Sequence, residues 1–144
     1  MRTIERIQFH YQEIKVPLKD KKTIREWIVG AITREGKKTG DIDYIFCTDE
    51  ILLKLNQEYL QHDDYTDVIT FDYTDENRVS GDIFISYERI VENATELNIA
   101  TEDELKRVMI HGVLHLCGYK DKNPVDKKRM TEKENEHLAF HPGA

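Results

Sequence analysis

The sequence predicts one domain built from both α-helices and β-strands, with a histidine-bearing helix at its centre. Runs rich in β-branched and aromatic residues alternate along the chain with segments whose apolar residues recur at helical spacing. The length of 144 residues suffices for one core and is too short for two ordinary domains. An almost wholly apolar segment, residues 108–121, carries two histidines four residues apart. We therefore expect a single domain spanning residues 1–144.

The first half of the chain predicts two strands and two helices. Thr23 and Glu26 have the spacing of a capping box, which marks a helix start, and Gly36 is a plausible stop for that helix. The apolar residues between them define one helical face. We expect, in order, a strand at residues 4–9, a helix at 23–35, a strand at 43–48 and a helix at 49–59.

The second half predicts a hairpin followed by three helices. Thr101 and Glu104 form a second capping box, which opens the histidine helix. Asn123 and Pro124 fit the N-cap and the first position of the last helix. We expect strands at residues 67–72 and 81–86 joined by a charged turn, a helix at 87–97, the histidine helix from 101, and a last helix to about residue 140.

Composition limits the classes of partner. A net charge of −7 and a pI near 5.4 argue against a protein that coats nucleic acid by bulk electrostatics, and no DNA partner is expected. No apolar run approaches the 18 or so residues that cross a bilayer, and the N-terminal residues lack the core of a signal peptide, so we expect no membrane partner and a cytoplasmic protein. Cys47 and Cys117 are expected to be reduced core residues.

The histidine helix predicts a metal site. His111 and His115 lie about 40° apart on one helical face. Gly118 comes where the helix would stop, so the chain can turn back and present Asp121, in the pattern H-x3-H-x2-G-x2-D. Two histidines and one oxygen ligand are what an open catalytic zinc site requires. The alternative is a pair of packed, hydrogen-bonded histidines, but their apolar flanks make unpaired imidazoles costly and favour a metal.

Other polar residues have simpler interpretations. His137 and His141 lie on or just past the last helix and are expected to be solvated, and His10 has no visible partner. The acidic residues 132, 134 and 136 read as the exposed face of the last helix. A basic cluster begins beside the predicted metal site and could hold a phosphate there; it comprises Lys120, Lys122, Lys127, Lys128 and Arg129.

Four segments resemble the YbeY family of metal-dependent endoribonucleases. They read L-N-Q-E-Y at residues 55–59, T-D-V-I-T-F at 66–71, G-D-I-F-I at 81–85 and H-G-V-L-H-L-C-G-Y at 111–119. The resemblance implies an α+β domain in which a small mixed sheet packs against helices, with a zincin-like zinc site on the histidine helix. It also implies cleavage of single-stranded RNA, rRNA maturation at the 3′ end of the small-subunit rRNA, ribosome quality control and the small ribosomal subunit as a partner.

Two departures from the family pattern concern the site. The family usually has a histidine where this chain has Asp121, and the carboxylate could shift the metal preference from zinc toward manganese or magnesium. The family usually has a phosphate-binding arginine where this chain has Leu60. Either Lys120 or His62 would then supply the missing charge, as candidate catalytic residues, or the nuclease activity would be weaker.

The chemistry expected of this site is metal-assisted hydrolysis of a phosphodiester. No positioned general base is obvious. Two alternatives remain: a metalloprotease-like hydrolase and a non-catalytic ribosome-assembly factor with a structural metal. The H-E-x-x-H motif of metalloproteases needs a glutamate where this chain has Gly112, which argues against the first. An open fourth coordination position would favour an enzyme, and a fourth protein ligand would favour the assembly factor.

Overall fold

The strands form one mixed sheet in the order β1-β2-β4-β3, within the part of the chain that the computed structural model describes, residues 6–60 and 66–143. Strands β1 and β4 each pair with β2 in parallel, and β3 pairs with β4 as an antiparallel hairpin. The strands are β1 (Ile7–Tyr11), β2 (Lys38–Cys47), β3 (Val68–Asp72) and β4 (Arg78–Ser86). The predicted α+β class with a small mixed sheet is confirmed.

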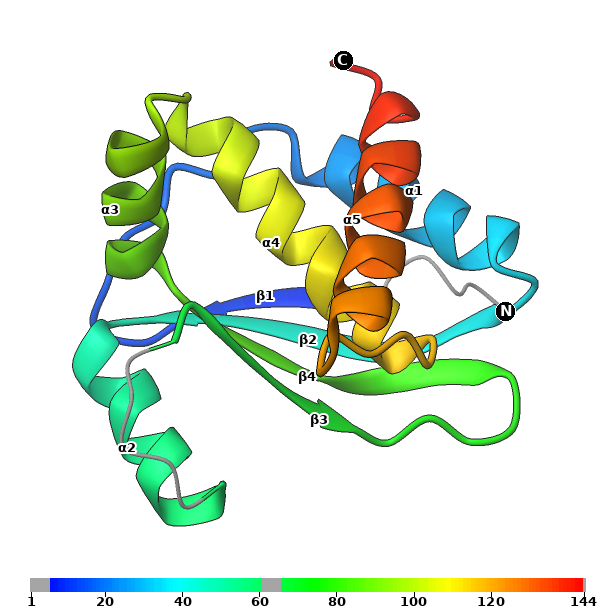
Figure 1. Ribbon diagram of the computed structural model, residues 1–144, viewed down its shortest axis with the longest axis horizontal. Helices are drawn as coiled ribbons and strands as arrows, with labels where there is room; N and C mark the ends of the chain where they lie inside the picture. The colour runs from blue at the N-terminus through cyan, green and yellow to red at the C-terminus, as the bar shows by residue number, and fades with distance from the viewer. Residues whose placement is uncertain (1–5, 61–65, 144) are drawn as a thin grey trace.

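Helices cover the two faces of this sheet unequally. The helices are α1 (Lys21–Arg34), α2 (Asp49–Tyr59), α3 (Tyr87–Leu97), α4 (Thr101–Leu116) and α5 (Pro124–Ala139). Figure 1 shows α1, α3, α4 and α5 on one side of the sheet and α2 on the other. Helix α4, which carries the histidines, lies between the sheet and α5. Among the described helices, none combines the length and the apolar character that a membrane crossing requires.

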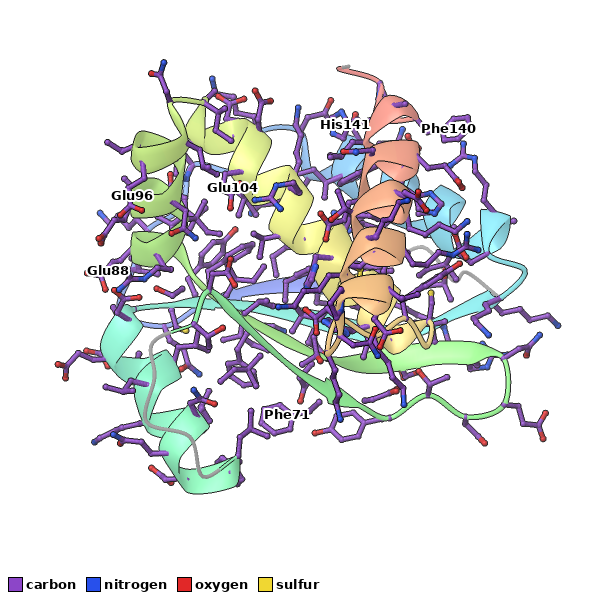
Figure 2. All side chains as sticks on the ribbon, in the orientation of Figure 1. Phe71, Glu88, Glu96, Glu104, Phe140 and His141 are labelled. Carbon is purple, nitrogen blue, oxygen red and sulfur yellow. The ribbon has the colours of Figure 1, made fainter. Side chains whose placement is uncertain are left out.

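Two apolar clusters hold these layers together. The larger one fills the space between the sheet and helices α1 and α4, where the Tyr44 hydroxyl donates to the Met109 carbonyl at 2.9 Å. The indole N–H of Trp27 donates to the His137 carbonyl at 2.8 Å and so ties α1 to α5. A smaller cluster lies under α2, toward which Phe71 projects from β3 (Figure 2). Helix α4 is thus packed on the sheet, and α1 is linked to α5.

Most element types are as the sequence predicted. The hairpin is confirmed, and α2 and α3 span the predicted residues. The Asn123 side chain caps α5 by accepting from the Asp126 N–H at 2.8 Å, and Pro124 follows. Strand β2 begins at Lys38, earlier than predicted, because Lys38 pairs with Arg78 at the start of a longer β4. Strand β1 starts and ends later than predicted, and residues 4 and 5 lie outside the described part.

Both predicted capping boxes are wrong. Helix α1 begins at Lys21, earlier than predicted, and its N-cap is Asp20, whose carboxylate accepts from the Thr23 N–H at 3.2 Å and from the Thr23 hydroxyl at 2.5 Å. Helix α4 follows Ala100 without a side-chain cap. Glu104 is only 1% exposed and accepts from Arg107 at 2.6 Å instead. The glutamate that local spacing assigned to the helix end therefore forms an ion pair with Arg107 instead.

Candidate metal centre

Helix α4 places the two predicted histidine ligands one turn apart. Apolar residues on either side of His111 and His115 pack on the sheet and hold this part of the helix in place. The imidazole rings lie 4.5 Å apart between centroids, and their Nε2 atoms are separated by 3.0 Å. Their side chains are 19% and 24% exposed, so both rings lie near the surface without facing open solvent.

A glycine turn brings the third predicted ligand to the histidines. Gly118 has a φ of +108°, in the region that favours glycine, and its N–H donates to the His115 carbonyl at 3.0 Å. The next N–H, from Tyr119, donates to the Leu114 carbonyl at 3.0 Å and closes the helix end. The chain then reverses, and Asp121 Oδ2 lies 3.4 Å from His111 Nε2 and 3.5 Å from His115 Nε2.

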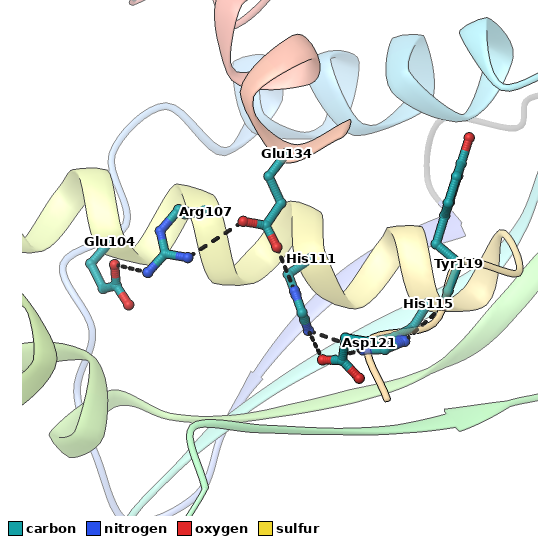
Figure 3. A network of polar contacts seen from close by, with 7 residues as sticks. All are labelled: Glu104, Arg107, His111, His115, Tyr119, Asp121 and Glu134. Atoms are coloured by element: carbon teal, nitrogen blue, oxygen red, sulfur yellow. Dashed lines mark hydrogen bonds and ion pairs between the residues drawn. The ribbon is translucent and has the colours of Figure 1, made fainter. Parts of the chain in front are cut away.

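Hydrogen bonds on the far side of each ring fix its tautomer. His111 Nδ1 lies 2.5 Å from Glu134 Oε2, and His115 Nδ1 lies 3.0 Å from the Tyr119 carbonyl (Figure 3). A carboxylate and a carbonyl oxygen can only accept, so each Nδ1 carries the proton. In the neutral rings both Nε2 lone pairs therefore point toward each other and toward the Asp121 carboxylate.

These three atoms match the geometry of a shared divalent cation. Ligands at about 2.0–2.1 Å from a tetrahedral zinc ion lie about 3.3 Å apart. The observed separations among the two Nε2 atoms and Asp121 Oδ2 are 3.0, 3.4 and 3.5 Å. Three lone-pair-bearing atoms at such distances repel one another unless a cation or a proton lies between them. The residues present therefore fit a metal ion.

Two partly buried ion pairs, both made by Arg107, hold the partner of His111. Glu134 projects from α5 and is 3% exposed, and its second oxygen lies 3.4 Å from Arg107. Arg107 in turn lies 2.6 Å from Glu104, one turn earlier on α4. Figure 3 shows the resulting chain of contacts from Glu104 through Arg107 and Glu134 to His111. This arrangement orients the first imidazole and keeps its Nδ1 proton in place.

A second network holds the loop between α4 and Asp121. The Tyr119 hydroxyl donates to Glu35 Oε1 at 2.6 Å. The other oxygen of Glu35 lies 2.6 Å from His137 Nε2 and 3.2 Å from Lys133 Nζ, both on α5. Because the Tyr119 carbonyl accepts from His115, this network joins the end of α1 to the second histidine through one residue.

The partners shift the pKa values of the two histidines in opposite directions. Burial disfavours the charged form of His111, but the hydrogen bond and the charge of Glu134, with smaller contributions from Asp121 and Asp67, raise its pKa. Burial, followed by the charge of His111, lowers the pKa of His115. His115 is therefore neutral near pH 7, which is the form that binds a metal.

Two hollows meet at the metal centre and form one groove. One, of about 460 Å³, extends toward the end of α2 and includes Asn56, Leu60 and Thr70. The other, of about 300 Å³, extends along α5. Both are lined by Asp67, Val68, His111 and Asp121. Asp67, for which the sequence left open a loop-capping or a groove-lining role, thus lines the groove on both sides of the centre.

The residues expected to supply a phosphate-binding charge have separate positions. Leu60 lines the hollow toward α2 and brings no charge to it. Lys120 is exposed and lines neither hollow as far as the described residues define them. His62 lies outside the described residues, in the segment 61–65.

Several polar residues have roles that differ from the predicted ones. Glu134 is not on an exposed face of α5, and His137 is 0% exposed rather than solvated. The sequence did carry one signal: Met130, Glu134 and His137 recur at helical spacing and share the buried face. His141 packs its ring 4.8 Å from that of Trp27, and His10 has a partner, Asp43, at 2.8 Å.

The family model and the named relatives agree on one family. The family model described as Endoribonuclease YbeY matches residues 6–141. A relative named Endoribonuclease YbeY from Flavobacterium johnsoniae is 50% identical over 136 residues, covering 94% of this chain and 97% of the relative. One of the same name from Parabacteroides distasonis is 48% identical, covering 94% and 96%. A solution structure from Thermotoga maritima superposes with a TM-score of 0.64 at 32% identity, covering 92% of this chain and 86% of that one.

Proposed function

The chain belongs to the YbeY family of endoribonucleases, and from this membership we propose that it cleaves single-stranded RNA during rRNA processing. The family makes the protein a hydrolase and RNA its substrate. The finer proposal is maturation of the 3′ end of small-subunit rRNA, with a part in ribosome quality control and the small ribosomal subunit as the partner. We further propose that the chain forms one such domain, since its one sheet and the larger of its two apolar clusters include elements from both halves of the described chain.

The proposed cofactor is one divalent cation held by His111, His115 and Asp121. The observation that carries this proposal is the convergence of the Nε2 atoms of both histidines and a carboxylate oxygen, with ligand atoms all within 4.8 Å of one another. Zinc is the first choice because two imidazoles favour it, and manganese or magnesium is the alternative because of the carboxylate. When bound, such an ion supplies Lewis acidity at the phosphoryl oxygen and lowers the pKa of water.

The chain's own residues prepare the site for this reaction. Glu134 and the Tyr119 carbonyl hold the imidazoles with their Nε2 atoms toward the groove. The rings therefore do not have to reorient when substrate binds. The groove continues on both sides of the centre, as an endonuclease requires, because nucleotides must extend in both directions from the bond that is cut.

The structure argues against the metalloprotease alternative. A Cβ atom at Gly112 would lie 2.7 Å from Ile83 Cγ2, so the position after the first histidine faces the sheet. A glutamate there would collide with the core and could not reach the groove. The structural-metal alternative is also less well supported, because within the described part of the chain the ligand group contains three residues and no fourth.

One cleavage assay tests the proposed function. The metal content of the purified protein is measured by elemental analysis, and cleavage of a single-stranded RNA is followed before chelation, after chelation and after metal is restored. His111→Ala and Asp121→Ala should lose both metal and cleavage. His10→Ala is the matched control, because His10 is exposed and pairs with Asp43 away from the centre. Equal cleavage with and without chelation would refute the metal-dependent mechanism.

A further inference from the structure

The part of the groove along α5 has a composition suited to an RNA backbone. Lys127 and Thr131 lie four residues apart on α5, hence on one face, and both line this hollow beside His111. The opposite part, toward α2, is lined among the described residues by amides, hydroxyls, carboxylates, imidazoles and apolar groups, with no lysine or arginine. Any fixed positive charge from the described lining must therefore come from the α5 side.

Charge balance shows that such a cation is needed. The carboxylates at and beside the centre outweigh the positive charge of a bound divalent ion and Arg107 together. They belong to Asp67, Asp121, Glu104 and Glu134. Arg107 is already committed, at 2.6 Å from one glutamate and 3.4 Å from another. A phosphodiester would add a further negative charge, so RNA binding here requires a cation with no partner of its own.

Lys127 meets this requirement. It is exposed, lines the hollow along α5 and forms no ion pair with any residue in the described ranges 6–60 and 66–143. The other members of its basic cluster, Lys120, Lys122, Lys128 and Arg129, do not line the hollow. Arg129 instead lies over the Tyr119 ring, at 5.9 Å from its centroid. The cluster therefore presents one of its charges to the metal centre.

We propose that Lys127 binds a phosphate of the RNA backbone next to the one that is cut, on the α5 side of the metal centre. Thr131 offers a hydroxyl to the same backbone one turn further along the helix. This contact supplies from α5 the positive charge that Leu60, at the end of α2, does not supply. The inference rests on the proposed function, since it concerns the substrate of the same site.

The test compares Lys127→Ala with Lys128→Ala, which removes the same charge from the neighbouring exposed residue. Binding of a fluorescent single-stranded RNA is measured by anisotropy over a range of salt concentrations, in metal-loaded and in chelated protein. We expect Lys127→Ala to weaken binding about tenfold and to reduce the slope of log K against log salt by about 0.7. Lys128→Ala should leave both nearly unchanged, and Lys127→Arg should restore most of the affinity.

Parallel measurements separate this inference from the proposed function. Metal content should be the same in all three variants and the wild type, and the cleavage defect of Lys127→Ala should fall mainly on KM. RNA binding that depends on Lys127 without any cleavage would refute the proposed nuclease activity and keep the phosphate contact. Equal affinity and equal salt slope in Lys127→Ala and Lys128→Ala would overturn the inference, as would a wild-type protein that binds no RNA.

Discussion

Substitution of Glu134 isolates the role of the carboxylate behind the first histidine. Glu134→Gln keeps an oxygen that can accept from His111 Nδ1 but removes the charge from a contact of 2.5 Å. Because Glu134 is 3% exposed, water cannot replace the lost interaction. A charge-assisted hydrogen bond is about twice as strong as a neutral one, so about 1.4 kcal/mol should be lost, which is about tenfold in metal affinity. Glu134→Ala removes the acceptor as well and should cost up to about 100-fold.

Competition with a chromogenic chelator measures these affinities directly. Glu132→Gln and Glu132→Ala are the matched controls, since Glu132 lies on the same helix with its side chain exposed. Circular dichroism of the metal-free proteins checks that each variant folds. If Glu134→Gln and Glu134→Ala bind the metal as tightly as the wild type, the reasoning that the buried carboxylate orients His111 is refuted.

Three further predictions concern residues around the centre. Burial opposes ionisation of Glu35, but hydrogen bonds from Tyr119, His137 and Lys133 lower the pKa of its carboxyl group in the folded protein. The ionised carboxylate therefore stabilises the fold above about pH 4.3, the pKa of an unfolded glutamate, and this stabilisation is lost as the pH falls through the lower native pKa. Tyr119→Phe should therefore reduce stability by about 1–3 kcal/mol at neutral pH and flatten this acid dependence in denaturant titrations; an unchanged pH profile would contradict it. Gly112→Ala should cost about 1–3 kcal/mol by pressing on Ile83, and wild-type stability in a thermal melt would argue against close packing there. Burial, with smaller effects of nearby carboxylates, raises the pKa of Cys47 to about 12. Iodoacetamide at pH 8 should therefore modify this thiol only in unfolded protein. Rapid labelling of the native protein, detected by mass spectrometry, would disprove this.

The geometry of the candidate metal centre was predictable because its proposed ligands are close in the sequence. Spacing on one helix defines the relation of His111 to His115, and Gly118 limits where the chain can turn, so Asp121 follows from local geometry. The apolar flanks of the histidines gave a second signal, since they indicated that the helix is buried. Local composition and helical periodicity likewise predicted the types of most helices and strands.

The supporting residues were not predictable in the same way, because they depend on how α5 meets the rest of the fold. Glu134 and His137 lie in a highly charged helix, and only the approach of α4 and α1 makes burial of these polar groups favourable. For Glu104 the local pattern was misleading: its spacing from Thr101 fits a capping box, but its carboxylate pairs with the Arg107 guanidinium instead of capping the helix. A buried charge is explained by its partner, and the partner is often distant in sequence.

The most direct test of the metal centre is X-ray absorption at the edge of the bound metal, with the stoichiometry from elemental analysis of the same sample. The wild-type protein should contain one divalent ion per chain, with two imidazole nitrogens and a carboxylate oxygen at about 2.0–2.1 Å if the ion is zinc. Removal of either His111 or Asp121 should abolish this signal. A metal-replete protein that holds no stoichiometric ion, or one whose ion is unaffected by these substitutions, would contradict the assignment of the centre.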